Sequence, residues 1–277
     1  MTAAPRPLVA NLPGGLALRA VWQYRGFVAG LVRREFSARY LQSVLGSAWA
    51  LLTPLALIAI YTLVFANVMG ARLPGTTDRF AYSIYLCAGL LPWTYFSEVL
   101  LRALSVFLDN AALLKKVSFP RSVLPVALLC SATLNFAIIF GILLLVLAGL
   151  GRFPGWAVLA LLPLLALQQA FALGLGVLLG VLNVFFRDVG QLVGVLLQFW
   201  FWLTPIVYSP AVLPERARDW LAWNPLTALV GAYQDILLTG AWPAWSTFGW
   251  HVVLVAVVCG LAVFAFSRLE GELVDEL

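Results

Sequence analysis

Charged side chains are scarce in this chain: Asp, Glu, Lys and Arg make up 10% of its 277 residues, whereas hydrophobic residues make up 63%. A soluble globular domain carries about 25% charged residues, so the composition indicates burial against lipid instead of a water-facing fold. Strand-type alternation is missing from the apolar runs, which disfavours a β-barrel. The sequence therefore predicts an all-α integral membrane protein.

Several chemical motifs are absent as well. No G-x-x-x-x-G-K-[ST] phosphate loop occurs, so this chain cannot bind ATP in that way, and any ATP hydrolysis must come from a partner. Paired carboxylates of glycosidase or metal-dependent transferase type are missing from the apolar runs. The single histidine, His251, and three unrelated cysteines indicate packing instead of catalysis or ligation. We expect a non-catalytic chain with no cofactor or metal of its own.

Six charge-free runs are near or above the about 20 residues that a helix needs to cross a bilayer. They predict six transmembrane helices, with approximate spans 48–70, 80–101, 122–150, 156–183, 190–208 and 248–267. Ion-driven transport is disfavoured, because coupling needs ionisable groups near the midplane and the runs contain none. Gly89 and Pro92 interrupt the second run, so its helix is expected to be kinked or broken.

The remaining segments complete the predicted organisation. Residues 1–20 read as a flexible cytoplasmic leader, and residues 21–40 suit an amphipathic helix at the membrane interface. The transmembrane domain is expected over residues 41–268, with a cytoplasmic tail at residues 269–277. Within it, residues 209–245 mix prolines, charges and aromatic rings, which suits short re-entrant helices; an ordinary surface loop is the alternative.

Basic residues predict the orientation. If the N-terminus is cytoplasmic, twelve of the 17 Lys and Arg residues fall on the inner side and five on the outer side. The positive-inside rule then places both termini in the cytoplasm. The net charge of +5 agrees with this asymmetry, because basic residues are attracted to the anionic inner leaflet. The pattern of charges gives no indication of nucleic-acid binding.

A basic stretch between the second and third predicted spans holds the only two lysines, Lys115 and Lys116, followed by Phe119, Pro120 and Arg121. A charge at the bilayer centre costs at least about 2.5 kcal/mol, so this stretch marks a point where the chain leaves the membrane. It is either a docking loop for a cytoplasmic partner or only a positive-inside determinant.

Two charged pairs flank other runs. Glu98 and Arg102 follow the second run at i,i+4 spacing and can pair on one helical face; a functional ionisable site is the alternative. Arg187 and Asp188 are the only charges in the very short connection between the fourth and fifth runs. That connection predicts an antiparallel helix pair with a tight cytoplasmic turn.

Aromatic side chains are what the predicted spans offer in place of charge. They can stack on the C–H faces of sugar rings without fixing one orientation, which suits a sliding polymer. An interfacial aromatic belt or lipid-facing packing is the alternative. The candidate lining residues are Trp49, Tyr61, Phe65, Trp93, Tyr95, Phe199, Trp200, Trp202 and Tyr208.

Five motifs, in this order, resemble those of the transmembrane subunits of type-2 ABC exporters for O-antigen, capsular polysaccharide and teichoic acid. They are Arg33-Arg-Glu-Phe-x-Ala-Arg-Tyr40, Leu113-Leu-Lys-Lys-x-x-Phe-Pro-Arg121, Asn183-x-x-x-Arg-Asp-Val189, Thr204-Pro-Ile-x-Tyr208 and Asn224-Pro-Leu226. The Lys-Lys-x-x-Phe-Pro-Arg block is the most specific of the five. The resemblance covers most of the chain from about residue 25 to residue 268.

The resemblance implies a homodimer of six-span subunits in the bacterial inner membrane, in contact with membrane lipids. Two copies of a separate ABC ATPase, carrying ATP and Mg²⁺, would drive export of lipid-linked polysaccharide. The implied ATPase-coupling residues are Arg33, Arg34, Glu35, Lys115, Lys116, Phe119, Pro120, Arg121, Arg187 and Asp188.

Three other functions stay open. The same fold can export a small amphipath or a lipo-oligosaccharide. A membrane-embedded transferase acting on lipid-linked sugars is a second alternative, although the missing acidic clusters argue against it. An ATP-independent lipid scramblase is the third, and the basic docking block argues against that one.

Overall fold

The computed structural model describes residues 22–40, 80–116 and 120–276, together with a few isolated residues between 48 and 73. Within these ranges the chain forms helices and connecting turns, with no β-strand, which confirms the all-helical prediction for this part of the chain. The predicted leader at 1–20 and most of the first predicted span, 48–70, lie outside the described residues.

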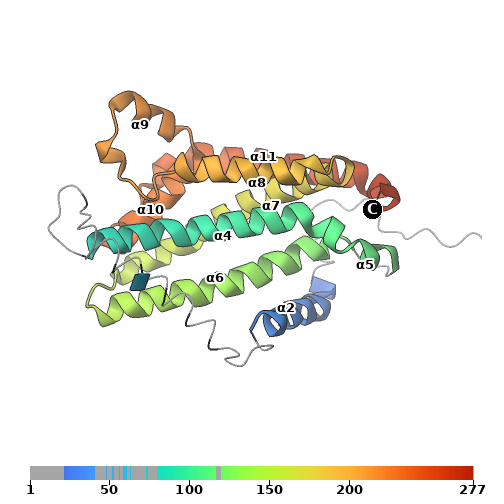
Figure 1. Cartoon of the computed structure of the whole chain (residues 1–277), viewed down its shortest axis with the longest axis horizontal. Helices are drawn as coiled ribbons and strands as arrows, with labels where there is room; N and C mark the ends of the chain where they lie inside the picture. The colour runs from blue at the N-terminus through green and yellow to red at the C-terminus, as the bar shows by residue number, and fades with distance from the viewer. Residues whose placement is uncertain are drawn as a thin grey trace, which may run out of the picture.

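Four of the described helices are long and apolar enough to cross a membrane (Figure 1). The 29 residues of α4 alone extend over about 43 Å, which exceeds the about 30 Å thickness of the hydrocarbon core. The four are α4 (Ala81–Asp109), α6 (Val123–Gly149), α7 (Leu161–Phe185) with its preceding 3-10 turn η3 (Gly155–Ala160), and α11 (Gly249–Glu276).

Helix α4 continues past residue 101, the predicted end of its span, and reaches Asp109. It also runs unbroken through Gly89 and Pro92, so the predicted break does not occur. Gln168 ties this part of α4 to α7, since its side-chain Nε2 donates a hydrogen bond to Pro92 O at 2.6 Å.

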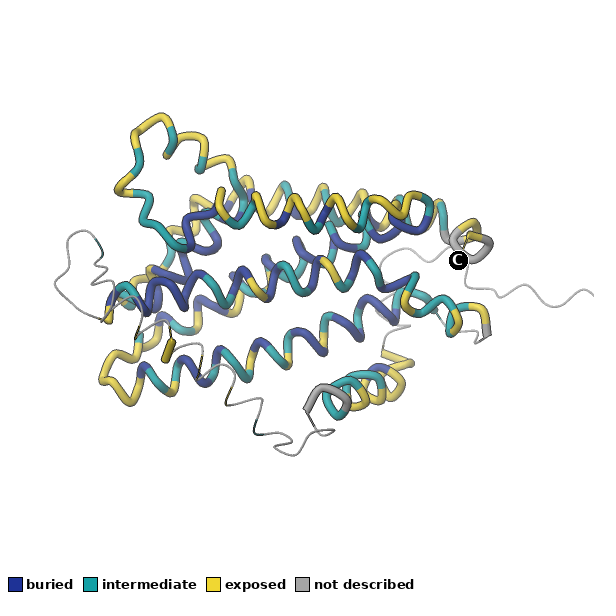
Figure 2. Tube along the Cα trace, viewed as in Figure 1, coloured by how far each residue is buried: buried dark blue, intermediate teal, exposed yellow. Residues whose placement is uncertain are grey.

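Helix α4 lies at the centre of the bundle and contacts α6, α7, α8 and α10. Figure 2 shows buried residues concentrated along it. Its close approach to α7 depends on two glycines. A Cβ at Gly176 would lie 2.6 Å from Ala103 Cβ, and one at Gly180 would lie 2.7 Å from Ala103 O. Any larger side chain at either position would push the two helices apart.

Helix α8 (Asp188–Trp202) is much shorter than its predicted span. Its 15 residues extend over about 22 Å, less than the hydrocarbon core, so α8 is not among the four long apolar helices. The predicted span 190–208 therefore ends early, at residue 202, and the chain turns through residues 203–209. The described helices alone do not establish a count of six spans.

The segment predicted to be re-entrant contains two short helices. They are α9 (Glu215–Ala222) and α10 (Pro225–Thr239), flanked by the 3-10 turns η4 (Pro210–Val212) and η5 (Trp245–Phe248). Helix α9 buries no residue and projects from the bundle, whereas α10 packs against α4 and buries Tyr233 and Ile236 completely (Figure 1). Only the second short helix thus contributes to the core.

Two further helices, α2 (Arg25–Tyr40) and α5 (Ala111–Lys116), flank the bundle. Helix α2 packs on α6, where Val28 lies in a small apolar cluster with Val123 and Ala127. Helix α5 and the C-terminal end of α11 lie at one end of the molecule, and α9 lies at the other (Figure 1). The last helix runs to Glu276, so the predicted tail, 269–277, belongs to α11 up to that residue.

Candidate functional site

An ion-pair cluster joins α2 to α4. The Nη2 atom of Arg102 lies 2.6 Å from Glu35 Oε1, and its Nη1 atom lies 3.2 Å from Glu98 Oε1. The contact with Glu98 confirms the i,i+4 pairing expected from the sequence, whereas the partner on α2 was not predicted. All three side chains are partly buried, with 20% to 36% of their surface exposed, so solvent screens them less than it would an open surface pair.

A buried amide joins three helices close to this cluster. The Nδ2 atom of Asn183, on α7, donates to Leu104 O of α4 at 3.3 Å. Its Oδ1 atom accepts from the backbone N–H of Gly190 on α8 at 2.9 Å. The tight turn between α7 and α8 is closed by a bond of 3.0 Å from Val189 N to Phe186 O. Asn183 therefore holds this turn against α4.

The backbone after α8 is irregular, and side chains from other helices bond its carbonyl groups. The hydroxyl of Tyr85 lies 2.9 Å from both Pro205 O and Tyr208 O, and Gln234 Nε2 donates to Pro205 O at 3.2 Å. The hydroxyl of Tyr82 donates to Val207 O at 2.6 Å. Unpaired backbone groups cost several kcal/mol each in hydrocarbon, so these side chains make the break between residues 203 and 209 tolerable.

Asn224 links the same break to the start of α10. Its Oδ1 atom accepts from Trp200 Nε1 at 2.8 Å and from the backbone N–H of Leu226 at 3.0 Å, which caps α10. Its Nδ2 atom donates to Leu203 O and to Thr204 Oγ1, both at 3.0 Å. The motifs that begin at Thr204 and Asn224 therefore contact each other, which their separation in the sequence did not reveal.

A groove of about 730 Å³ lies between α4 and α8 and combines aromatic rings with polar side chains. We call it the α4–α8 groove. Gln191 and Gln198 lie two helical turns apart on one exposed face of α8. Amides in contact with lipid would be costly, so this face suits water or a second protein surface. The lining includes Trp93, Ser97, Gln191, Gln198, Phe201 and Trp202.

Comparison with known proteins decides the family. The profile of ABC-2 type transporters matches residues 28–238, from α2 almost to the end of α10. This chain belongs to the ABC-2 type transporter family. It is 35% identical to the O-antigen export system permease protein RfbA of Myxococcus xanthus, over 79% of this chain and 83% of that protein.

Two further relatives of this ABC-2 family chain cover more of its length at lower identity. The O-antigen export system permease protein RfbA of Klebsiella pneumoniae is 28% identical over 84% of this chain and 89% of its own. The polysialic acid transport protein KpsM of Escherichia coli is 24% identical over 89% of this chain and 95% of its own. The family match over residues 28–238 includes the ion-pair cluster and the α4–α8 groove.

The predicted coupling residues of this ABC-2 family member lie on three separate segments. Arg33 and Arg34 are exposed on α2, but Glu35 is partly buried and faces Arg102. Phe119 and the side chain of Lys116 lie outside the described residues, and the coupling role of the whole set stays a prediction. Elsewhere, the exposed members are Lys115, Arg187 and Asp188, and the partly buried members are Pro120 and Arg121.

The predicted aromatic lining is divided between several surfaces. Trp93 and Trp202 meet in the α4–α8 groove, and Phe199 is exposed on α8 beside it. Tyr95 instead faces α6 and is buried, with its ring 4.7 Å from that of Phe136. Trp200 points inward as well, 5.4 Å from the ring of Phe96.

The other predicted lining residues do not join this groove in the described structure. The hydroxyl of Tyr208 donates to Trp202 O at 2.9 Å, which places Tyr208 in the irregular segment after α8. Trp49, Tyr61 and Phe65 lie outside the described residues, so their contribution stays a prediction.

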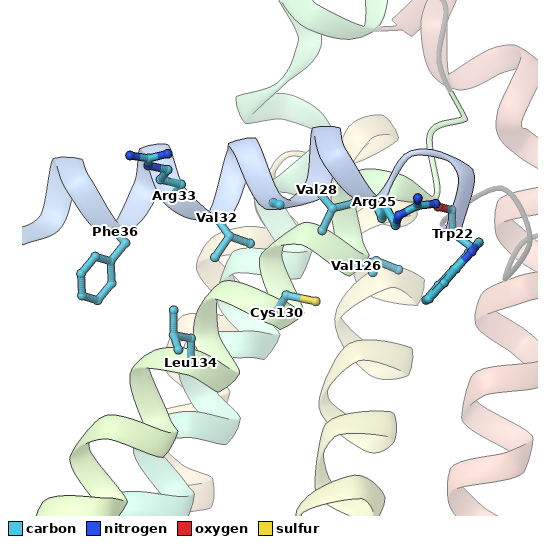
Figure 3. A pocket seen from close by; sticks show the side chains of 10 residues that line it. Trp22, Arg25, Val28, Val32, Arg33, Phe36, Val126, Cys130 and Leu134 are labelled. Carbon is cyan, nitrogen blue, oxygen red and sulfur yellow. The ribbon is translucent and has the colours of Figure 1, made fainter.

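A second groove, of about 600 Å³, runs beside the contact between α2 and α6 (Figure 3). Its lining is mainly apolar, with Val32 and Phe36 on one side and Val126 and Leu134 on the other. Val28 is the only buried residue among the α2 side chains that the structure describes. Among the described residues, α2 contacts the bundle through the apolar cluster around Val28, on which Leu31 and Val32 pack, and through the ion pair to Arg102.

The polar chemistry of the described residues contains no metal centre. No group of three or more His, Cys, Asp or Glu side chains in the described part of the chain could hold a metal ion. Cys87, Cys130 and Cys259 are free thiols. His251 is buried, with its ring 4.1 Å from that of Trp250. Cys87 and Cys259 pack in the core, whereas Cys130 is exposed.

Proposed function

We propose that this chain is the permease subunit of an ATP-driven exporter that moves lipid-linked polysaccharide, such as O-antigen or capsule, from the cytoplasm across the bacterial inner membrane. One observation carries the proposal: the α4–α8 groove brings aromatic rings and side-chain amides together in a chain whose relatives are named for O-antigen export and polysialic acid transport. Aromatic faces stack on sugar rings, and amides exchange hydrogen bonds with hydroxyl groups.

The exposed side of α8 supports an assembly of two copies. Only Val193 and Leu197 are buried on this helix, whereas Leu196, Phe199 and Trp202 are exposed. A second copy placed against this side would close the α4–α8 groove into a path that is polar and aromatic. A two-fold axis would place the same surface of each copy in contact, which is the commonest arrangement in homo-oligomers.

Energy must come from two copies of an ABC ATPase that bind ATP and Mg²⁺, because this sequence has no phosphate-binding loop. The ATPases would contact the exposed basic residues of α2, the segment around α5 and the turn between α7 and α8. In this arrangement the chain spans the membrane six times and both of its termini are cytoplasmic. Helices α9 and α10 would then be the re-entrant pair at the outer surface.

Deletion of this chain tests the transport function directly. Surface and intracellular polysaccharide are measured in the deletion strain and in the same strain resupplied with the wild-type chain. We expect surface glycan to disappear, glycan to accumulate inside the cell, and resupply to reverse both changes. Unchanged surface glycan would contradict the proposed function, and loss of a small amphipath alone would assign the cargo to the alternative class.

A further inference from the structure

We infer that Arg102 is a positioning residue. It links helix α2 to one turn of α4, and Asn183 links the same turn of α4 to the connection between α7 and α8. The two ATPase-facing segments therefore move as one body. This inference rests on the proposed function, and it assigns the mechanical link that the function needs. Neither Arg102 nor Asn183 is among the residues expected to contact the ATPase.

Three consecutive residues of α4 make the connection. Arg102 reaches α2 through Glu35 at 2.6 Å. Ala103 touches α7, where Gly176 and Gly180 leave no room for a Cβ. Leu104 O accepts from Asn183 Nδ2 at 3.3 Å. One turn of α4 therefore contacts both neighbouring helices, with no intervening flexible segment.

The connection continues from α7 to the start of α8. Asn183 Oδ1 accepts a hydrogen bond from Gly190 N at 2.9 Å. Gly190 is two residues after the exposed pair Arg187 and Asp188. A buried amide with partners on both sides fixes its neighbours more firmly than apolar contact alone. Closely packed helices shift as rigid bodies, so a displacement of this turn is passed to α4.

The α2 side of the connection depends on the ion pair. Val28, Leu31 and Val32 of α2 pack on α6 beside the apolar groove (Figure 3), and the ion pair adds a charged contact from α2 to α4. The Glu35 carboxylate is engaged with Arg102 of its own chain, whereas Arg33 and Arg34 are exposed. Glu35 thus belongs to the internal link, and the two arginines remain the surface that an ATPase can contact.

The test uses the full chain in complex with its ATPase. The variants Glu35→Gln, Arg102→Gln and the double variant are compared with wild type for membrane abundance, ATPase retention on purification, ATP turnover and surface glycan. We expect each single variant to lower export at least tenfold per inserted chain while ATPase retention and ATP turnover stay within about twofold. The double variant should lose no more than either single variant, because one link is broken in all three.

Two further variants separate linkage from simple stability. Arg102→Lys keeps a positive charge and should export more than Arg102→Gln at equal membrane abundance. Glu98→Gln is the matched control, since it removes the other carboxylate partner of Arg102 and keeps the pair between Arg102 and Glu35, and it should leave export within about twofold of wild type.

Several results would overturn the inference. They are normal export by Glu35→Gln, additive losses in the double variant, equal losses in Arg102→Lys and Arg102→Gln, or strong loss in Glu98→Gln. Loss of ATPase retention in Glu35→Gln would also overturn it, because Glu35 would then be a direct docking residue. Failure of the proposed function is distinguishable, since in that case the wild-type chain itself would not restore surface glycan to the deletion strain.

Discussion

Helices α4 and α11 differ in hydropathy and in burial, and the two differences run in opposite directions. Helix α4 is the least hydropathic of the four long apolar helices, yet 67% of its most apolar window is buried within the chain. Helix α11 is the most hydropathic, and only 11% of its window is buried. In a bilayer, an apolar helix can face lipid without cost, whereas polar side chains must be shielded from lipid by protein.

The polar groups of α4 explain its position in the fold. Tyr82 and Tyr85 near its beginning bond the irregular backbone after α8, and Arg102 near its other end binds Glu35 and Glu98. One central helix therefore contacts both the short helices at one end of the bundle and the α2 segment at the other. Helix α11 has no comparable polar side chain between Val252 and Ser267, and it serves as an apolar cover.

The largest expected effect comes from filling the space between α4 and α7. We expect Gly176→Leu to reduce the amount of folded chain in the membrane and to cost about 3 kcal/mol or more, since overpacking of a tight contact displaces backbone. Thermal unfolding of the purified chain in detergent measures the loss. The matched control is Gly260→Leu on α11, where a Cβ would meet nothing within 4 Å, and equal destabilisation by both would contradict the comparison.

A smaller effect is expected from Asn183→Leu, which keeps the volume but removes two hydrogen bonds. The expected cost is about 2 kcal/mol, at about 1 kcal/mol for each bond. Hydrogen exchange at the amide of Gly190 should rise at least tenfold, because this amide loses its acceptor. Unchanged exchange at Gly190 would show that the turn does not depend on Asn183.

Loss of a tyrosine hydroxyl at the start of α4 should weaken the break after α8. Tyr85→Phe removes a group that serves Pro205 O and Tyr208 O, and we expect a cost of about 1 to 2 kcal/mol. Tyr82→Phe removes the bond to Val207 O at a less buried position, so about 1 kcal/mol or less is expected. A larger effect at Tyr82 than at Tyr85, measured by thermal unfolding, would reverse the assigned order.

The smallest effect on stability is expected in the α4–α8 groove. The double variant Gln191→Leu with Gln198→Leu should leave unfolding unchanged within about 0.5 kcal/mol, since both amides are exposed. Surface glycan should nevertheless fall several-fold, because the groove loses its amide partners for sugar hydroxyls. Leu192→Ala, on an exposed position outside the groove lining, is the control and should export normally.

Long apolar runs were enough to locate two helices well. The predicted spans 122–150 and 156–183 nearly coincide with α6 (Val123–Gly149) and with η3 and α7 (Gly155–Phe185), because both runs are continuously apolar and are bounded by glycine, proline or charge. Membrane insertion selects for this pattern regardless of tertiary contacts. The membrane boundaries themselves stay a prediction.

Two helix ends depended on tertiary contacts and were placed poorly. Helix α4 continues beyond the charges at Glu98 and Arg102 because those charges are paired within the fold. Helix α8 ends at Trp202, ahead of Pro205, and partners from α4 and α10 bond the Pro205 carbonyl in the irregular segment that follows. The pairing of Glu98 with Arg102 was predicted from its local spacing, but Glu35 and the partners from α4 and α10 lie far from these helix ends in the sequence, so no local pattern contained them.

The candidate site was predictable in its residue types but not in its geometry. Trp93 and Tyr95 are two positions apart on α4, and aromatic content alone assigned both to one path. In the structure Trp93 lines the α4–α8 groove, whereas Tyr95 packs on α6. A helix turns about 100° per residue, so the two positions point to different neighbours. Only the packing of α4 decides which of them faces the groove.

Translocation of lipid-linked polysaccharide in vesicles tests the central claim most directly. The purified chain is reconstituted with and without its ATPase, and the appearance of glycan on the opposite side of the bilayer is followed with and without ATP. We predict movement only when the chain, the ATPase and ATP are all present. Equal movement with the chain alone in the absence of ATP would contradict an ATP-driven exporter and would indicate a scramblase.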